Sequence, residues 1–167
     1  MTARTRIIVG VVVERRKAAS QWIDFTWKAV TVLPGRPEAE SWTVLSAEDE
    51  CTTFYAGTAS IELHQGETTN YRDNIASSAP SVWIALRSTD AEPPYRVIAA
   101  TVDPSEGEAF TEAGTDLIES VPMPDLVRDA VAAFVAEHHV EREVFKRKRD
   151  RANPEALARR LPGEEGK

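Results

Sequence analysis

The chain has 167 residues, enough for one domain with its own core, and 42% of them are apolar. Its net charge of −7 argues against non-specific binding to nucleic acid or to an anionic membrane, because both would repel it. Residues 1–141 hold 11 lysines and arginines against 22 aspartates and glutamates, a net of −11, whereas residues 142–167 hold 9 against 5, a net of +4. The sequence therefore predicts an acidic body with a basic tail.

The first half of the chain predicts strands. The run Arg6–Arg15 is almost continuously apolar in its middle, which is typical of a strand that is buried on both faces and central in its sheet. The last two predicted strands suit an antiparallel hairpin with a long loop between them. The strands are expected at Arg6–Arg15, Phe25–Leu33, Trp42–Leu45, Thr52–Ala56, Ala59–His64, Ser81–Arg87 and Tyr95–Val102.

The second half predicts helices. A short one begins at Asp103-Pro104, the clearest one spans Asp125–His138, and a last piece follows Asn153-Pro154. The apolar stripe of Asp125–His138 consists of two rows at i, i+4 spacing, one of Leu126, Ala130 and Phe134 and one of Val127, Val131 and Val135.

Strands followed by helices indicate an α+β fold. We expect a mostly antiparallel sheet of about six to seven strands, with the C-terminal amphipathic helix packed on it, in a single domain over residues 1–145. Residues 146–167 are expected to form a basic, partly helical C-terminal tail.

The single cysteine, Cys51, excludes an internal disulfide and suits a reducing compartment. The apolar run Ile7–Val13 is too short to span a membrane, and charged residues follow it where a secretory signal needs small ones. We therefore expect a cytoplasmic protein without a membrane partner.

Motifs for catalysis or cofactor binding are missing from the sequence, which has neither a phosphate-binding glycine loop nor a nucleophile elbow. The segment Glu137–Glu141 gathers metal-ligand types, but neighbouring histidines on a helix point about 100° apart, so His138 and His139 do not suit one ion. The acidic neighbours of Cys51 favour its neutral thiol. We expect no catalytic residue, no metal and no cofactor.

The chain has four tryptophans. Trp22 lies close in sequence to Arg15 and Arg16, and tryptophan and arginine dominate the energetics of protein interfaces, so these three are candidate contact residues. Trp27 and Trp83 are expected to pack in the core.

The basic run after Phe145 is the strongest signal, because five of the six residues from 146 to 151 are basic. It suits phosphate binding, docking on an acidic partner protein, or a clamp on the chain's own acidic body within one chain or across a homodimer. A solvated face explains the same composition. Nucleic acid is disfavoured, since the acidic body repels it. The candidate contact residues are Phe145, Lys146, Arg147, Lys148, Arg149 and Arg151.

Several strings resemble an uncharacterised family of proteobacterial domains whose genes commonly lie among those for molybdenum-dependent formate dehydrogenase. The resemblance covers about residues 6–158. The strings are Val9–Arg16, Trp27–Val30 with Leu33–Gly35, Tyr71–Asn74, Pro94–Val97 with Thr101–Pro104, Val121–Pro124, and His138–Glu141 with Phe145–Arg151.

Members of that family are sometimes labelled as molybdopterin-guanine dinucleotide biosynthesis protein A. That nucleotidyltransferase has a glycine-rich loop after its first strand, whereas this chain has Glu14–Lys17 there, so the residues argue against the activity. The resemblance thus implies a pathway. We expect a non-catalytic accessory or assembly protein that docks a formate dehydrogenase subunit, or another assembly factor, through the basic run. The alternatives are an enzyme or carrier for the molybdopterin guanine dinucleotide cofactor, and a structural homodimer with tail exchange.

Overall fold

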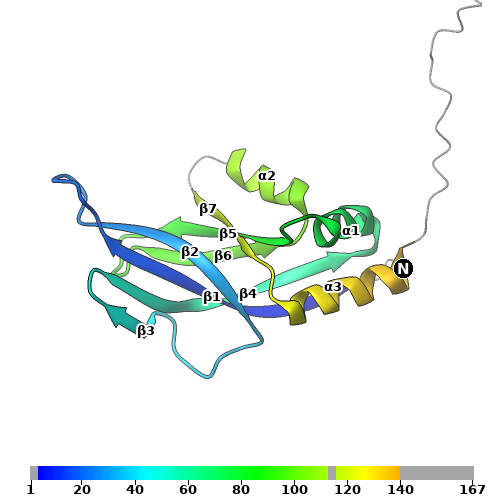
Figure 1. Cartoon of the computed structure of the whole chain (residues 1–167), viewed down its shortest axis with the longest axis horizontal. Coiled ribbons are helices and arrows are strands. Elements are labelled where there is room, and N and C mark those ends of the chain that lie inside the picture. The colour runs from blue at the N-terminus through cyan, green and yellow to red at the C-terminus, as the bar shows by residue number, and fades with distance from the viewer. Residues whose placement is uncertain (1–3, 113–115, 140–167) are drawn as a thin grey trace, which may run out of the picture.

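The computed structural model describes residues 4–112 and 116–139. Within these ranges it has seven strands in two antiparallel sheets and three α-helices, as the sequence predicts for the fold class (Figure 1). The strands are β1 (Arg4–Lys17), β2 (Phe25–Pro34), β3 (Thr43–Glu48), β4 (Cys51–His64), β5 (Ser81–Ser88), β6 (Tyr95–Thr101) and β7 (Asp116–Pro122). The helices are α1 (Thr68–Ala76), α2 (Pro104–Glu112) and α3 (Asp125–His138), with a 3-10 turn at Gln65–Glu67.

The first sheet has the order β2-β1-β4-β3. Its central strand β1 pairs along most of its length with β4 and, over its second half, with β2. The whole stretch Val9–Val13 is buried, which confirms the prediction of a strand covered on both faces. β1 and β4 are therefore the central pair of the first sheet, joined by main-chain hydrogen bonds along most of their length.

The second sheet has the order β6-β5-β7. The strands β5 and β6 form the predicted antiparallel hairpin, with Trp83 opposite Thr101 and Ser88 opposite Tyr95. At the seams between the sheets, β6 runs beside β4 and β7 runs beside β2. Apolar side chains from both sheets therefore meet in one core, in which Val11, Ile61 and Ile84 are fully buried.

The helices α1 and α3 pack against each other at the end of the sheets where β1 begins (Figure 1). The prediction for α3 is right in its bounds and in the row of Val127, Val131 and Val135, which is buried. The other row is wrong in part, because only Phe134 of it is buried while Leu126 and Ala130 are exposed. The helix packs on α1 and on the beginning of the first sheet with a narrower stripe than the sequence suggests.

Two of the predicted strands are one strand in the structure. Thr52–Ala56 and Ala59–His64 both belong to β4, and the glycine between them does not end the strand. Instead the register with β1 shifts between Val11 and Val12, so that Gly57, with φ +134°, belongs to a β-bulge. Neither α1 nor β7 was predicted.

Among the residues that the structure describes, no helix is long and apolar enough to cross a membrane.

Candidate functional site

The end of the first sheet that carries the β1–β2 hairpin holds a group of exposed apolar and charged side chains, and we call it the hairpin end. It comprises residues 14–28, the strand β3 and the beginning of β4. Alternation along β1 places consecutive residues on opposite faces. Arg15 follows the buried Val13 on the inner face, which carries the core, whereas Glu14 and Arg16 lie on the outer face.

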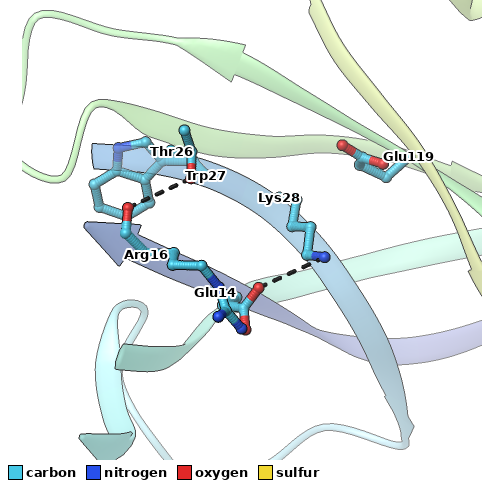
Figure 2. Close-up of a pocket in the computed structure, with 6 residues that line it drawn as sticks. All are labelled: Glu14, Arg16, Thr26, Trp27, Lys28 and Glu119. Atoms are coloured by element: carbon cyan, nitrogen blue, oxygen red, sulfur yellow. Dashed lines mark hydrogen bonds and ion pairs between the residues drawn. The ribbon is translucent and has the colours of Figure 1, made fainter. Parts of the chain in front are cut away.

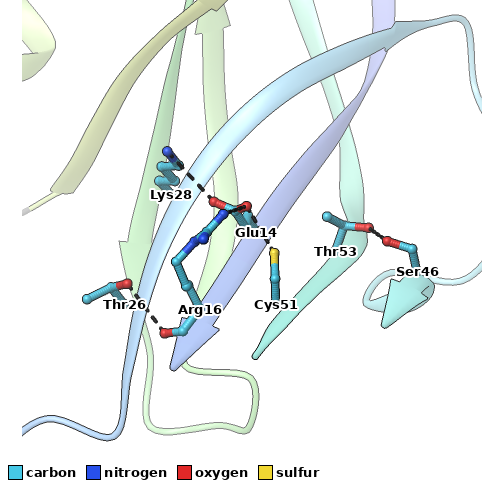
Figure 3. Close-up of polar contacts among 7 residues, drawn as sticks. All are labelled: Glu14, Arg16, Thr26, Lys28, Ser46, Cys51 and Thr53. Atoms are coloured by element: carbon cyan, nitrogen blue, oxygen red, sulfur yellow. Dashed lines mark hydrogen bonds and ion pairs between the residues drawn. The ribbon is translucent and has the colours of Figure 1, made fainter. Parts of the chain in front are cut away.

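Glu14 is the centre of the polar cluster on the outer face (Figure 3). Its carboxylate accepts hydrogen bonds from Arg16 at 2.9 Å and from the Cys51 thiol at 3.0 Å, and Lys28 lies 3.7 Å away. Only 12% of the Glu14 side chain is exposed. The hydrogen bonds from Cys51 and Arg16 lower the pKa of Glu14 below its ordinary value, so this carboxylate stays ionised. Its negative charge is balanced by the neighbouring Arg16 and Lys28.

The Cys51 thiol is held in its neutral form by the same contact. Its hydrogen bond to Glu14, followed by burial, raises its pKa above the ordinary value. The expected direction is therefore confirmed, although the responsible carboxylate is Glu14, from another strand, rather than the adjacent Asp49 and Glu50. A thiol in this setting is a weak nucleophile.

A shallow pocket of about 250 Å³ opens beside this cluster, at the seam where β7 runs beside β2. Figure 2 shows Lys28 between Glu14 and Glu119, so that positive and negative groups alternate around the opening. The hydroxyl of Thr26 donates to the backbone carbonyl of Arg16 at 3.4 Å. With Glu14 already paired to both cations, the pocket offers little net charge for an ionic ligand.

The inner face of the hairpin end carries an aromatic cluster. Trp27 stacks on Phe54 with ring centroids 5.9 Å apart, and Trp42 meets both rings edge-on at 6.0 and 5.7 Å. Tyr95 from the second sheet joins at 5.9 Å from Trp27. Edge-to-face and stacked pairs of this kind stabilise one another, so the four rings form a single packed apolar cluster.

Arg15 lies against this aromatic cluster. Its guanidinium carbon is 4.4 Å from the centroid of Phe25, 5.4 Å from that of Phe54 and 5.8 Å from that of Trp27. These distances are those of cation–π contacts. Among the side chains that the structure describes in residues 4–112 and 117–139, no carboxylate pairs with Arg15.

Exposed apolar side chains gather at the same end. The β1–β2 connection contributes Trp22, which is 90% exposed, and Ile23, and β2 begins with the exposed Phe25. On the other side of the sheet, the edge strand β3 exposes Val44 and Leu45. Large apolar side chains exposed in this number at one end of a sheet are candidates for a binding surface.

The structure brings together three of the candidate contact residues. Trp22, Arg15 and Arg16 all belong to the hairpin end, but Arg15 faces the aromatic cluster and Arg16 the Glu14 cluster. The remaining candidates lie outside the described residues, and they are Phe145, Lys146, Arg147, Lys148, Arg149 and Arg151. The predicted helical piece after Asn153 lies outside them as well.

The two neighbouring histidines have different partners, because α3 ends at His138 and His139 follows it in an extended conformation. His138 packs its ring on Phe134 at 4.5 Å. His139 accepts from Arg72 Nη1 at its Nε2, 3.1 Å away, so its Nδ1 carries the proton and donates to Thr68 Oγ1 at 2.9 Å. In the part of the chain that is described, no three potential ligand residues are grouped to hold a metal.

Two of the strings that carry the resemblance, Tyr71–Asn74 and Thr101–Pro104, form one buried polar network. The Asn74 amide donates to the carbonyls of Ser81 and Val102 and accepts from the Ser81 N–H, at 2.8, 2.9 and 3.0 Å. Asp103 accepts from the Ser105 N–H at 2.9 Å, as a cap of α2, and from Asn70 at 3.1 Å. These residues join α1 and α2 to the second sheet, so their role is structural.

Reasoning from the sequence missed the aromatic cluster and the central place of Glu14. The signal that was available is register: once Phe25–Leu33 is paired with the first strand, Arg15 falls opposite Trp27 and Glu14 opposite Lys28. Nothing in the local sequence indicates that Phe54 and Tyr95 join them.

A sequence model of a protein family matches residues 8–149, and the family is described as a protein of unknown function, DUF3305. No curated protein and no solved structure matches the chain. The matched range includes the whole hairpin end and, apart from Arg151, all the candidate contact residues of the tail.

Proposed function

The chain belongs to the DUF3305 family of proteins of unknown function, and we propose that it is a non-catalytic accessory protein that binds a partner protein through its hairpin end. The observation that carries this proposal is the exposed apolar set at that end, above all Trp22. The partner follows from the resemblance, which points to a subunit of a molybdenum-dependent formate dehydrogenase or to another of its assembly factors.

Trp22 supports partner binding because its ring packs against almost nothing in the part of the chain that the structure describes. Its backbone N–H is bonded to the Ser20 hydroxyl at 3.1 Å, while its ring is 90% exposed. Burying an aromatic side chain of this size at an interface contributes about 2 kcal/mol or more, and tryptophan is among the commonest interface hot spots. Ile23 and Phe25 extend the same surface.

The basic run fits the same proposal as a second contact. The last described residue, His139, is fixed to α1 close to where β1 begins, since Thr68 follows His64 and His64 pairs with Arg4. Arg15 lies eleven residues further along β1, about 35 Å away. Lys146 lies seven residues after His139, a span of at most about 25 Å. Lys146 therefore falls short of the hairpin end, whereas Arg149 and Arg151, ten and twelve residues after His139, reach it only if the chain between is almost fully extended. We propose that the first residues of the run contact a different part of the partner from the hairpin end.

The decisive test is affinity capture from the native cell under formate-grown, molybdate-replete conditions. We expect the wild-type chain to capture a formate dehydrogenase subunit or another assembly factor, and the double variant Trp22→Ser/Ile23→Ser to lose it. The matched control is Leu126→Ser, because Leu126 is also a large exposed apolar residue but lies on α3, away from the hairpin end.

Two outcomes contradict the proposal. One is capture of the same proteins by the double variant at the wild-type level. The other is binding of a pterin nucleotide by the purified chain in the absence of any protein partner, which indicates the cofactor carrier instead.

A further inference from the structure

We propose that Arg15 is a carboxylate-binding position, which recognises an acidic residue next to an apolar one in a segment of the partner protein. The inference rests on the proposed function in one respect, namely that a protein binds at the hairpin end. It adds the chemistry of the partner: an Asp or Glu for Arg15, and an adjacent apolar side chain for the surface around it.

The first support is the difference between Arg15 and its neighbours on β1. Arg16 and Arg6 each form an ion pair with a carboxylate. Arg16 Nη2 lies 2.9 Å from Glu14 Oε1, and Arg6 Nη2 lies 3.4 Å from Glu62 Oε1. Arg15 contacts aromatic rings instead, and its positive charge is not neutralised by any carboxylate of residues 4–112 or 117–139. An arginine with this environment has a free charge for an incoming anion.

The second support is the way in which the rings hold the guanidinium. Contacts with the rings of Phe25, Phe54 and Trp27 restrict the rotamers of Arg15 without using its N–H donors in an ion pair. The N–H donors lie in the plane of the group and match the two oxygens of a carboxylate. Because the ring contacts already restrict the side chain, less side-chain entropy is lost when the carboxylate binds.

The third support is the apolar surface beside Arg15. Val44 lies opposite Phe54 across the β3–β4 pair, and Phe25 lies opposite Lys17 across the β1–β2 pair, so exposed apolar groups flank the guanidinium on both sides. Hydrogen bonds between ions strengthen when apolar groups exclude water around them. A segment with an acidic residue next to an apolar one therefore complements both features at once.

The test selects peptides on the full chain from a displayed library of random heptapeptides. We expect the selected peptides to share an Asp or Glu adjacent to an aromatic or aliphatic residue. The tightest of them should bind Arg15→Met about tenfold more weakly or worse, as loss of a charge-assisted hydrogen bond implies. Arg6→Met is the matched control, an exposed arginine on the same strand, and should bind like the wild type.

Arg15→Lys is the second variant. It keeps the charge but loses the planar fork, so weaker binding than wild type is expected even if Arg15→Met does not fold. The proposal is overturned if the library yields no binder, if the selected peptides lack acidic residues, or if both Arg15 variants bind them as tightly as wild type.

Capture from cells separates this inference from the proposed function. If the wild-type chain and Arg15→Met capture the same dehydrogenase subunit equally, the carboxylate position is wrong while the accessory function stands. If peptide binding depends on Arg15 but no dehydrogenase subunit or assembly factor is captured, the position is right and the accessory function is wrong.

Discussion

The two ends of β1 differ in how far their side chains are satisfied within the chain. Where β1 begins, α1 and α3 close the core, and the buried polar groups of Tyr71, Asn74 and Asp103 all have partners. At the hairpin end, Trp22 projects into solvent and Arg15 has aromatic neighbours but no described carboxylate. The polar side chains of the first region are used in holding the fold, whereas Trp22 and Arg15 of the second region are available for contacts with another molecule.

This contrast also tells which part of the resemblance concerns the fold. We call the end where β1 begins, and where α1 and α3 cover the core, the closed end. The strings Tyr71–Asn74 and Thr101–Pro104 hold it together through main-chain and side-chain hydrogen bonds. The resemblance to the family over these two strings therefore concerns residues that hold the fold together. Function is better sought among the side chains of the hairpin end.

The change with the largest expected effect strikes the closed end. Asn74→Ala leaves two carbonyls and one N–H of the network without their partner, and we expect a loss of about 3 kcal/mol in the free energy of unfolding. Asn70→Ala is the control on the same helix, because its bonds to Glu67 and Asp103 are partly exposed, and it should cost about 1 kcal/mol. Urea denaturation measures both. Equal losses of stability in the two variants would show that the buried hydrogen bonds of Asn74 stabilise the fold no more than the partly exposed ones of Asn70.

A methyl group at Gly107 probes the packing of α2 on the second sheet. A Cβ there would lie 2.5 Å from Cγ of Trp83, which is too close for any real contact. We expect Gly107→Ala to destabilise the chain by about 1–3 kcal/mol, as overpacking does. Gly66→Ala, which meets no atom within 4 Å, should change stability by at most about 0.5 kcal/mol. Thermal unfolding of both variants checks the difference.

Tyr71 gives the closed end a pH dependence. Burial raises the pKa of Tyr71 above its ordinary value, although its hydrogen bond from the His64 N–H opposes this. The stability that accompanies the raised pKa is present below the unfolded value of about 10 and is lost as the pH rises further. Tyr71→Phe should cost about 1 kcal/mol at neutral pH.

The same variant should lose less stability than wild type between neutral pH and about pH 11. Urea midpoints at the two pH values measure this, and identical alkaline losses in both proteins would contradict the assignment.

At the hairpin end, Glu14→Gln should leave the fold intact and change chemistry instead. The carboxylate is the main cause of the raised pKa of Cys51, so its removal lowers that pKa. Alkylation of the thiol by iodoacetamide near neutral pH should then be several-fold faster. Glu48→Gln, which removes a weaker influence on Cys51, should accelerate it less. Unchanged rates in Glu14→Gln would mean that the hydrogen bond does not form in solution.

The smallest effect on stability is expected in the basic run. Replacing Lys146, Arg147, Lys148 and Arg149 by Ala should leave unfolding nearly unchanged, because exposed charges contribute about 0–1 kcal/mol each. We expect slower, less salt-dependent association with the partner and lower formate dehydrogenase activity in cells. If cells with this variant keep full formate dehydrogenase activity and the captured partner is unaltered, the basic run has no role in binding.

A chain that ends at residue 143 should still unfold cooperatively. If it does not, the residues after 143 are needed for the fold.

Sequence reasoning succeeded where one local pattern decides the structure. The continuous apolar run of β1 and the helical spacing of Val127, Val131 and Val135 are visible in single segments, and both were predicted. By contrast, α1 has few apolar residues and is held by Tyr71 and Asn74, whose partners lie in other elements. β7 lacks clear alternation and owes its place to pairing with β5.

The candidate site was predicted in part for the same reason. Trp22, Arg15 and Arg16 lie close together in sequence and were predicted as contact residues for that reason, and all three belong to the hairpin end, although Arg15 is half-buried against the aromatic cluster. The aromatic cluster draws Trp42, Phe54 and Tyr95 from distant parts of the chain. Only the register of the first sheet and its packing on the second bring these rings to Arg15.

The anchoring of His139 to α1 fixes the place from which the rest of the chain continues, about 35 Å from Arg15 along β1. If one partner binds both the hairpin end and the basic run, docking of the first makes docking of the second an intramolecular event, and the two affinities reinforce each other through effective concentration. The number of residues between His139 and the run then sets how far apart the two acceptor sites of that partner can lie.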